Sequence, residues 1–131
     1  MAECIAGGLR EADPSLTVKL FNSAVDDKND IVTEVFKSKA ILVGSPTINY
    51  GYLFSIGGIM EMIRGLKFRN KKAAAFGSYG WSGEAVKQIT ALLDGAGFEI
   101  VNDGLRCQWA PDEATQKLCR DYGREFASAV R

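Results

Sequence analysis

AAAFGSYGWSGEAV, residues 73–86, is the segment around which the predicted fold of this chain is organised. It opens as a short apolar run, passes through seven glycine-rich residues and ends in the first turn of a predicted amphipathic helix. An apolar run this short, bounded by glycine and followed by a helix, is typical of a buried parallel strand and a tight strand-to-helix loop.

The loop within this stretch has the composition of a ligand site. Gly77, Gly80 and Gly83 are expected to let the backbone approach a ligand closely and to tolerate positive φ. Tyr79 and Trp81 offer broad faces suited to covering a flat ring, and the start of the next helix adds unpaired N–H groups. The alternative is a glycine-rich connection whose aromatic side chains plug the end of the sheet.

Predicted helices and strands alternate through the rest of the chain. Helices are expected over residues 1–12, from a cap within 26–30 to Phe36, over 53–65 and 84–96, and from Pro111 to beyond Phe126. Strands are expected at Leu16–Phe21, Ala40–Gly44 and Ala73–Phe76, and over 98–109 with a bend or short hairpin at 102–104. This order predicts an α/β fold with a doubly wound parallel sheet, in a single domain spanning residues 1–131.

Two loops of this predicted fold follow strands directly, namely Ser45–Gly51 and Gly77–Gly83. Ligands of doubly wound sheets bind outside the carboxyl ends of the strands. We therefore expect both loops at one crevice.

The composition of the chain excludes several kinds of partner and site. The 131 residues carry 16 basic and 16 acidic side chains, so the net charge indicates no nucleic-acid partner. The absence of histidine excludes His-containing zinc and iron sites and a triad with a histidine base, so redox chemistry would need a bound organic cofactor. No apolar run is long enough to span a membrane and no secretion signal is visible, which with three widely spaced cysteines predicts a cytoplasmic protein.

Several residues are predicted to have structural rather than chemical roles. Cys119 is expected to be a structural thiol, and Cys107 and Trp109 are expected to share a core-facing side of the last strand. The basic run Lys67–Lys72 is predicted to be a solvated connection, with docking of an acidic electron-transfer partner as the alternative.

Three segments together resemble the flavodoxin-like domain of flavodiiron proteins (A-type flavoproteins). They are GSPTIN at 44–49, GLK at 65–67 and NKKAAAFGSYGWSGEAV at 70–86, and the resemblance extends over essentially the whole chain. It implies a five-stranded parallel sheet in the order 2-1-3-4-5 with helices on both faces, and FMN as the cofactor. It also implies electron transfer to a di-iron site in a separate metallo-β-lactamase-like domain, from a redox donor. Carried over by motif position, the flavin would lie between two groups of residues, Ser45, Pro46, Thr47, Ile48 and Asn49 on one side and Ser78, Tyr79, Gly80, Trp81, Ser82 and Gly83 on the other.

The resemblance begins inside the family's first helix, so we expect the first strand and its phosphate-binding loop to be absent. Flavin binding is then expected to be impaired, no catalytic centre is expected in this chain, and no metal site. We expect Leu16–Phe21 to shift into the vacant position and pair with Ala40–Gly44, with dimerisation because the helix over 1–12 would cover the core poorly. The alternatives are a non-binding remnant of the fold that acts as an oligomerising module, and a flavodoxin-like NAD(P)H–quinone reductase.

Overall fold

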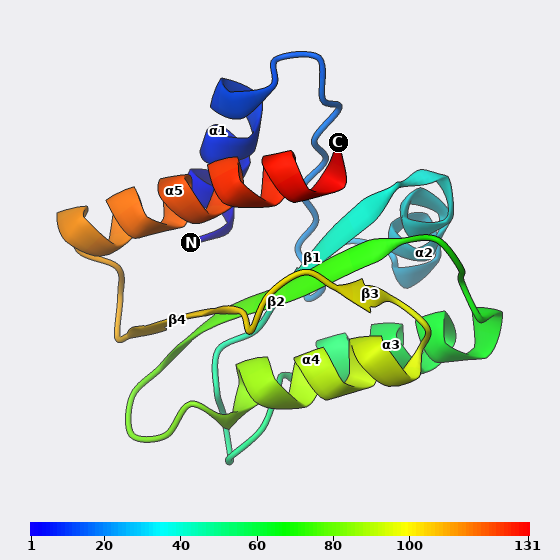
Figure 1. The fold of residues 1–131 in the computed structure, drawn as a ribbon. Helices are drawn as coiled ribbons and strands as arrows, with labels where there is room; N and C mark the ends of the chain where they lie inside the picture. The colour runs from blue at the N-terminus through cyan, green and yellow to red at the C-terminus, as the bar shows by residue number, and fades with distance from the viewer.

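A parallel sheet with helices on both faces forms the body of the protein, as the computed structural model of residues 1–131 shows (Figure 1). The elements in chain order are α1 (Ala2–Ala12), α2 (Lys28–Lys37), β1 (Ala40–Gly44), α3 (Phe54–Leu66), β2 (Lys72–Tyr79), α4 (Glu84–Gly95), β3 (Glu99–Ile100), β4 (Leu105–Gln108) and α5 (Glu113–Val130). The predicted α/β fold class with a parallel sheet is therefore confirmed.

The central strand is β2, which pairs in parallel with three other strands. Its first edge carries β1, in a register that places Ala40 opposite Lys72 and Gly44 opposite Phe76. Its second edge carries β3 near its start and β4 near its end. Three consecutive alanines of β2, Ala73–Ala75, are fully buried, because helices cover both faces of the sheet at this point.

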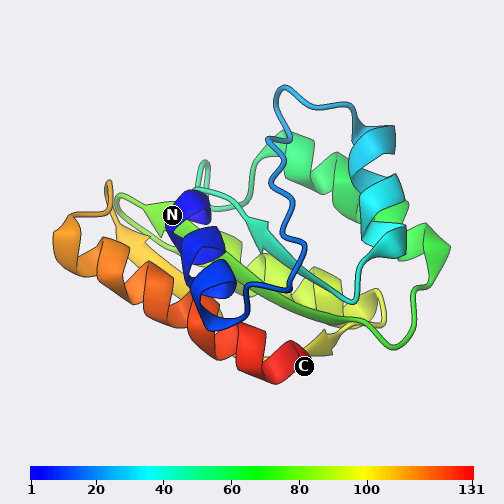
Figure 2. The same cartoon turned by 90° about the horizontal axis from the view of Figure 1, so that it is seen from above.

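Two apolar cores hold the helices to the sheet. Helices α2, α3 and α4 cover one face, where Ile59, Ile63 and Ile89 are buried against the sheet. Helices α1 and α5 cover the other face and lie side by side in both ribbon views (Figures 1 and 2). Ile5 of α1 and Phe126 of α5 are buried there, so the expectation that the first helix covers the core poorly is wrong.

Polar caps explain where two of the helices begin. The carboxylate of Asp27 accepts a hydrogen bond from the N–H of Asn29 at the start of α2. The carboxylate of Asp112 accepts one from the N–H of Thr115 at the start of α5. Each bond satisfies a donor that the first helical turn leaves free. Hydrogen bonding to Thr115 lowers the pKa of Asp112 below its ordinary value.

The predicted strand Leu16–Phe21 is the main error in the expected fold. This segment is a coil between α1 and α2 (Figure 2), and β1 pairs only with β2. The alternation of apolar and polar residues in this segment nevertheless matches its packing, because Leu16 and Val18 pack against the core under α1 and α5. The segment is held by its side chains instead, since Lys19 Nζ lies 2.9 Å from the Glu34 carboxylate. The predicted shift onto β1 does not occur, and one edge of β1 has no hydrogen-bonded neighbour.

The last strand bends rather than forming a hairpin. Both β3 and β4 run parallel to β2, so the chain keeps its direction through the turn that separates them. Gly104 adopts φ +92°, and a Cβ there would lie 2.8 Å from the carbonyl oxygen of Ala75. Asn102 accepts a hydrogen bond from the Gly104 N–H and lies 2.9 Å from the Tyr122 hydroxyl. Burial raises the pKa of Tyr122 to about 12.

Two large apolar side chains, one on α2 and one on α5, are exposed. Phe36 on α2 and Leu118 on α5 have exposed side chains, although both fall at helical spacing from buried residues. The prediction for the thiols is confirmed: Cys107 and Cys119 are buried, and burial raises the pKa of both. None of the five helices is both long and apolar enough to cross a membrane.

Candidate functional site

The two glycine-rich and serine-rich loops meet at the carboxyl ends of β1 and β2. The N–H of Thr47 donates to the carbonyl of Ser78 over 2.8 Å, and the Thr47 hydroxyl accepts from the N–H of Ala85 over 3.2 Å. The side chain of Gln88 donates to the carbonyl of Tyr50 over 2.9 Å. The two loops therefore lie together at this end of the sheet, as expected.

The hydroxyls of the first loop are already used by the protein. Ser45 is buried, and its hydroxyl donates to the carbonyl of Pro46 and accepts from the N–H of Leu53. The Thr47 hydroxyl caps the start of α4, as described above. Further along this loop, Ile48 and Asn49 are exposed. The exposed part of the first loop is thus its tip, and not its serine.

This tip carries backbone strain. Asn49 and Tyr50 adopt φ +50° and +61°, so the backbone of two successive residues is in the left-handed region. A tyrosine in that region is a conformational outlier, and such outliers cluster at ligand-binding sites. The N–H groups of Asn49 and Tyr50 donate to no acceptor in the protein.

The three glycines of the second loop are explained by close contacts within the protein. None of them has positive φ, so that part of the expectation is wrong. A Cβ on Gly77 would lie 2.0 Å from the Ser45 carbonyl oxygen. A Cβ on Gly80 would lie 2.9 Å from the Trp109 ring, and one on Gly83 would lie 2.9 Å from the Arg106 guanidinium. The glycines therefore let neighbouring protein groups pack closely against the loop, and these contacts hold the loop in its conformation.

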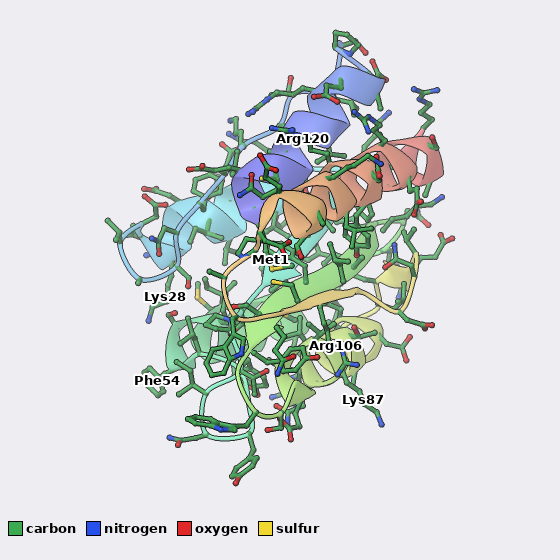
Figure 3. The ribbon with its side chains drawn as sticks, turned by 90° about the vertical axis from the view of Figure 1, so that its left-hand side faces the viewer. Met1, Lys28, Phe54, Lys87, Arg106 and Arg120 are labelled. Carbon is green, nitrogen blue, oxygen red and sulfur yellow. The ribbon has the colours of Figure 1, made fainter.

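Strand β4 and the residue after it contribute a part of the site that the sequence interpretation missed. Arg106 Nη1 lies 3.4 Å from the Gly83 carbonyl oxygen, and Gln108 Nε2 donates to the Gly80 carbonyl over 3.1 Å. The N–H of Trp109 donates to the Tyr79 carbonyl over 2.7 Å. The Arg106 guanidinium also lies 5.5 Å from the centre of the Tyr79 ring, and Figure 3 shows this side chain between β4 and α4.

With three of its carbonyls held by β4 and Trp109, the second loop has a row of free donors. The backbone N–H groups of residues 80–84 donate to no acceptor in the protein. Beside them, one carboxylate oxygen of Glu84 is buried without a hydrogen-bond partner. Buried polar groups are normally paired, so this oxygen fits a ligand that brings an N–H or O–H donor. The N–H groups of residues 80–84 fit a ligand with several acceptors.

Two exposed aromatic side chains, Trp81 and Trp109, meet at the same loop. The Trp81 side chain is 94% exposed, and its ring meets the Trp109 ring edge to face at 6.1 Å between centroids. Trp109 is 60% exposed, so its predicted place in the core is wrong. The remaining predicted residues of this loop, Ser78, Tyr79, Gly80, Ser82 and Gly83, are half-buried. Exposed aromatic faces beside unpaired N–H groups are suited to binding a flat heteroaromatic ring.

The basic run lies elsewhere and is partly occupied by structural contacts. Lys71 Nζ donates to the carbonyls of Phe36 and Ser38, and Lys72 Nζ donates to the carbonyl of Ala129. An open groove of about 600 Å³, lined in part by Lys67 and Arg69, lies near the amino-terminal end of β2. This groove is at the opposite end of the sheet from the two loops, and two of the four basic side chains of the run serve the fold.

Comparison with known proteins identifies the fold family. The family model described as flavodoxin matches residues 1–123 of the 131. The chain belongs to the flavodoxin family. Family membership implies a flavin cofactor, which agrees with the free donors and exposed aromatic rings of the two loops.

Relatives of this flavodoxin chain include flavodiiron proteins. The anaerobic nitric oxide reductase flavorubredoxin of Escherichia coli is 50% identical over 127 residues, which are 97% of this chain and 26% of that protein. This chain thus spans about a quarter of the length of the curated relatives it matches. The flavodiiron core of Flv1 from Synechocystis superposes with a TM-score of 0.88 at 29% identity, over 98% of this chain and 32% of that one. The resemblance to the flavodoxin-like domain of flavodiiron proteins is confirmed.

A shorter structural neighbour matches this flavodoxin chain over most of its own length. A flavodoxin from the domain Archaea superposes with a TM-score of 0.85 at 28% identity, over 98% of this chain and 87% of that one. The fold of the chain therefore matches both the stand-alone flavodoxin and the flavodiiron core.

Proposed function

We propose that this flavodoxin domain binds FMN and transfers electrons as part of a flavodiiron-type protein. The observation that carries the proposal is the row of five unpaired N–H groups at residues 80–84 beside the exposed ring of Trp81. An isoalloxazine ring has several acceptors at its pyrimidine end and one N–H donor there. The row of N–H groups matches the acceptors, and the unpaired oxygen of Glu84 matches the donor.

The protein residues would hold and orient the cofactor. Trp81 would stack on one ring face, and the exposed loop tip at Ile48 and Asn49 would border the ring on the other side. The glycine contacts described above keep the N–H groups pre-organised, which lowers the entropic cost of binding. Bound flavin supplies electron-carrying capacity that none of the side chains provides.

The wider assignment rests on the relatives. We propose a metallo-β-lactamase-like di-iron domain as the electron acceptor and a separate redox protein as the donor, both in the cytoplasm. Support for this comes from the 50% identity to a flavorubredoxin, and the three free thiols fit a reducing compartment.

We expect this chain to bind FMN and riboflavin with affinities within about tenfold of each other. The two flavins differ in the phosphate of FMN, and a charged phosphate gains affinity mainly through charge-assisted hydrogen bonds. The hydroxyls of Ser45 and Thr47 are already bonded within the protein. Titration of the 131-residue chain, followed by flavin fluorescence, measures both dissociation constants. Trp81→Ala should weaken binding of either flavin by roughly 1–3 kcal/mol, whereas Trp81→Phe, which keeps an aromatic face, should lose less.

Two results would contradict this expectation. Nanomolar FMN affinity with strong discrimination against riboflavin would show that the chain holds the phosphate after all. Absence of binding to both flavins would favour the non-binding remnant instead.

We also propose that two copies associate through the free edge of β1. Ala40–Gly44 is an apolar strand with a hydrogen-bonded neighbour on one edge only. Unpaired strand edges readily accept another strand. Light scattering after size-exclusion chromatography should show a dimer that dissociates on dilution. A monomer at every concentration up to the millimolar range would refute the association.

A further inference from the structure

Trp109 is held in a conformation that a tryptophan rarely adopts. Its φ is +60°, in the left-handed region that favours glycine, and it immediately follows β4. Bulky residues remain in this region only where surrounding contacts impose it. For Trp109, the contact that imposes this conformation is the 2.7 Å hydrogen bond from its N–H to the Tyr79 carbonyl.

The Trp109 side chain lies directly against the second loop. Its ring atoms Cζ3 and Cη2 would lie 2.9 and 3.0 Å from a Cβ on Gly80. Its ring also meets the Trp81 ring edge to face, with an interplanar angle of 72°. One residue therefore contacts both the backbone before Trp81 and the Trp81 ring itself.

Two hydrogen bonds, from the Trp109 N–H and from the neighbouring Gln108 side chain, orient the free N–H groups. In a trans peptide the C=O and the following N–H point in opposite directions. The Tyr79 carbonyl faces Trp109, so the Gly80 N–H points away from it. The Gly80 carbonyl faces the Gln108 side chain, so the Trp81 N–H also points away from β4.

We infer that Trp109 is a positioning residue, which fixes the Trp81 ring and the adjoining N–H groups in the orientation that binds the flavin ring. This inference rests on the proposed flavin function for its ligand. Its geometry rests on the contacts of Trp109 with the Trp81 ring, with Gly80 and with the Tyr79 carbonyl. Residues 109 and 81 are far apart in the sequence, so the contact exists only in the folded chain.

The experiment uses the fact that the chain has two tryptophans, Trp81 and Trp109. In Trp109→Phe and Trp109→Ala, tryptophan fluorescence comes from Trp81 alone. Phe keeps a ring edge against Trp81, whereas Ala removes it. Time-resolved anisotropy without flavin should show a larger fast depolarisation of Trp81 in the Ala variant than in the Phe variant, because side-chain rotation on the picosecond to nanosecond scale becomes free.

The ligand readout is riboflavin titration of the same variants. Trp109→Ala should weaken riboflavin binding about 3- to 10-fold and Trp109→Phe by less than about twofold, as expected for loss or retention of an aromatic pair. Gly80→Ala should weaken binding about tenfold when Trp109 is present and much less when it is combined with Trp109→Ala, because the clash partner is then gone.

The outcomes separate this inference from the proposed function. Equal Trp81 mobility in the Phe and Ala variants would overturn the positioning role, and so would increased mobility with unchanged riboflavin affinity. If the unmodified chain binds no flavin, the proposed function fails, and the anisotropy comparison alone decides whether Trp109 positions Trp81.

Discussion

Gly77→Ala is expected to lower the free energy of unfolding by about 3 kcal/mol and to weaken flavin binding at least about tenfold. The added methyl group would lie 2.0 Å from the Ser45 carbonyl oxygen and 3.3 Å from a Val86 methyl. Both are parts of the packed interior, and a backbone oxygen cannot turn aside. The loop after β1 must therefore move away from β2, which breaks the bond from the Thr47 N–H to the Ser78 carbonyl.

Gly65→Ala is the matched control for this variant. Gly65 lies in α3, and a Cβ there would meet nothing within 4 Å. Replacement should stabilise the protein by roughly 0.5–1 kcal/mol, since alanine favours a helix, and leave flavin affinity unchanged. Urea denaturation and flavin titration measure the two quantities. A Gly77→Ala variant with unchanged stability would show that the two loops can separate freely.

Gly8→Ala is expected to destabilise the fold by about 3 kcal/mol, whereas Gly7→Ala should stabilise it by roughly 0.5–1 kcal/mol. A Cβ on Gly8 would lie 2.0 Å from the Arg120 carbonyl oxygen of α5, and a Cβ on Gly7 would meet nothing within 4 Å. Both glycines lie in α1, so the gain in helix propensity is the same for each. The difference of about 4 kcal/mol measures how closely α1 crosses α5.

Thermal or urea unfolding of the two single variants tests this difference. Gly123, on the opposite side of the crossing, has the same property, because a Cβ there would lie 2.2 Å from the Ile5 carbonyl oxygen. Gly123→Ala should therefore resemble Gly8→Ala. Equal stabilities for the Gly7 and Gly8 variants would mean that α1 is free to move off α5.

Much of the fold follows from local sequence patterns. The apolar runs at Ala40–Gly44 and Ala73–Phe76 form adjacent strands. The five helices begin and end within a few residues of their expected bounds. This works because buried strands and amphipathic helices leave periodic signals in the residues themselves. The two loops could be placed together for a topological reason, since the carboxyl ends of parallel strands share one edge of the sheet.

Strand pairing at Leu16–Phe21 could not be predicted in this way. Alternation correctly indicated that Leu16 and Val18 face the core. Alternation does not say whether another backbone lies within hydrogen-bonding distance, and here none pairs with the segment. Likewise, Gly7 and Gly8 look equally unfavourable in a helix sequence, although only Gly8 faces another backbone.

From the residues alone we could therefore predict the alternating α/β order, the proximity of the two loops and the resemblance to flavodiiron flavodoxin domains. The folded chain was needed to show which group each glycine of the second loop contacts. It was also needed to show that this loop is held by Arg106, Gln108 and Trp109. A glycine in a sequence can indicate a position where a side chain would not fit, but it does not indicate which other group lies there. Here the neighbouring groups belong to Ser45, Trp109 and Arg106, each more than twenty residues along the chain from the glycine that it contacts. Sequence periodicity carries no information about such contacts.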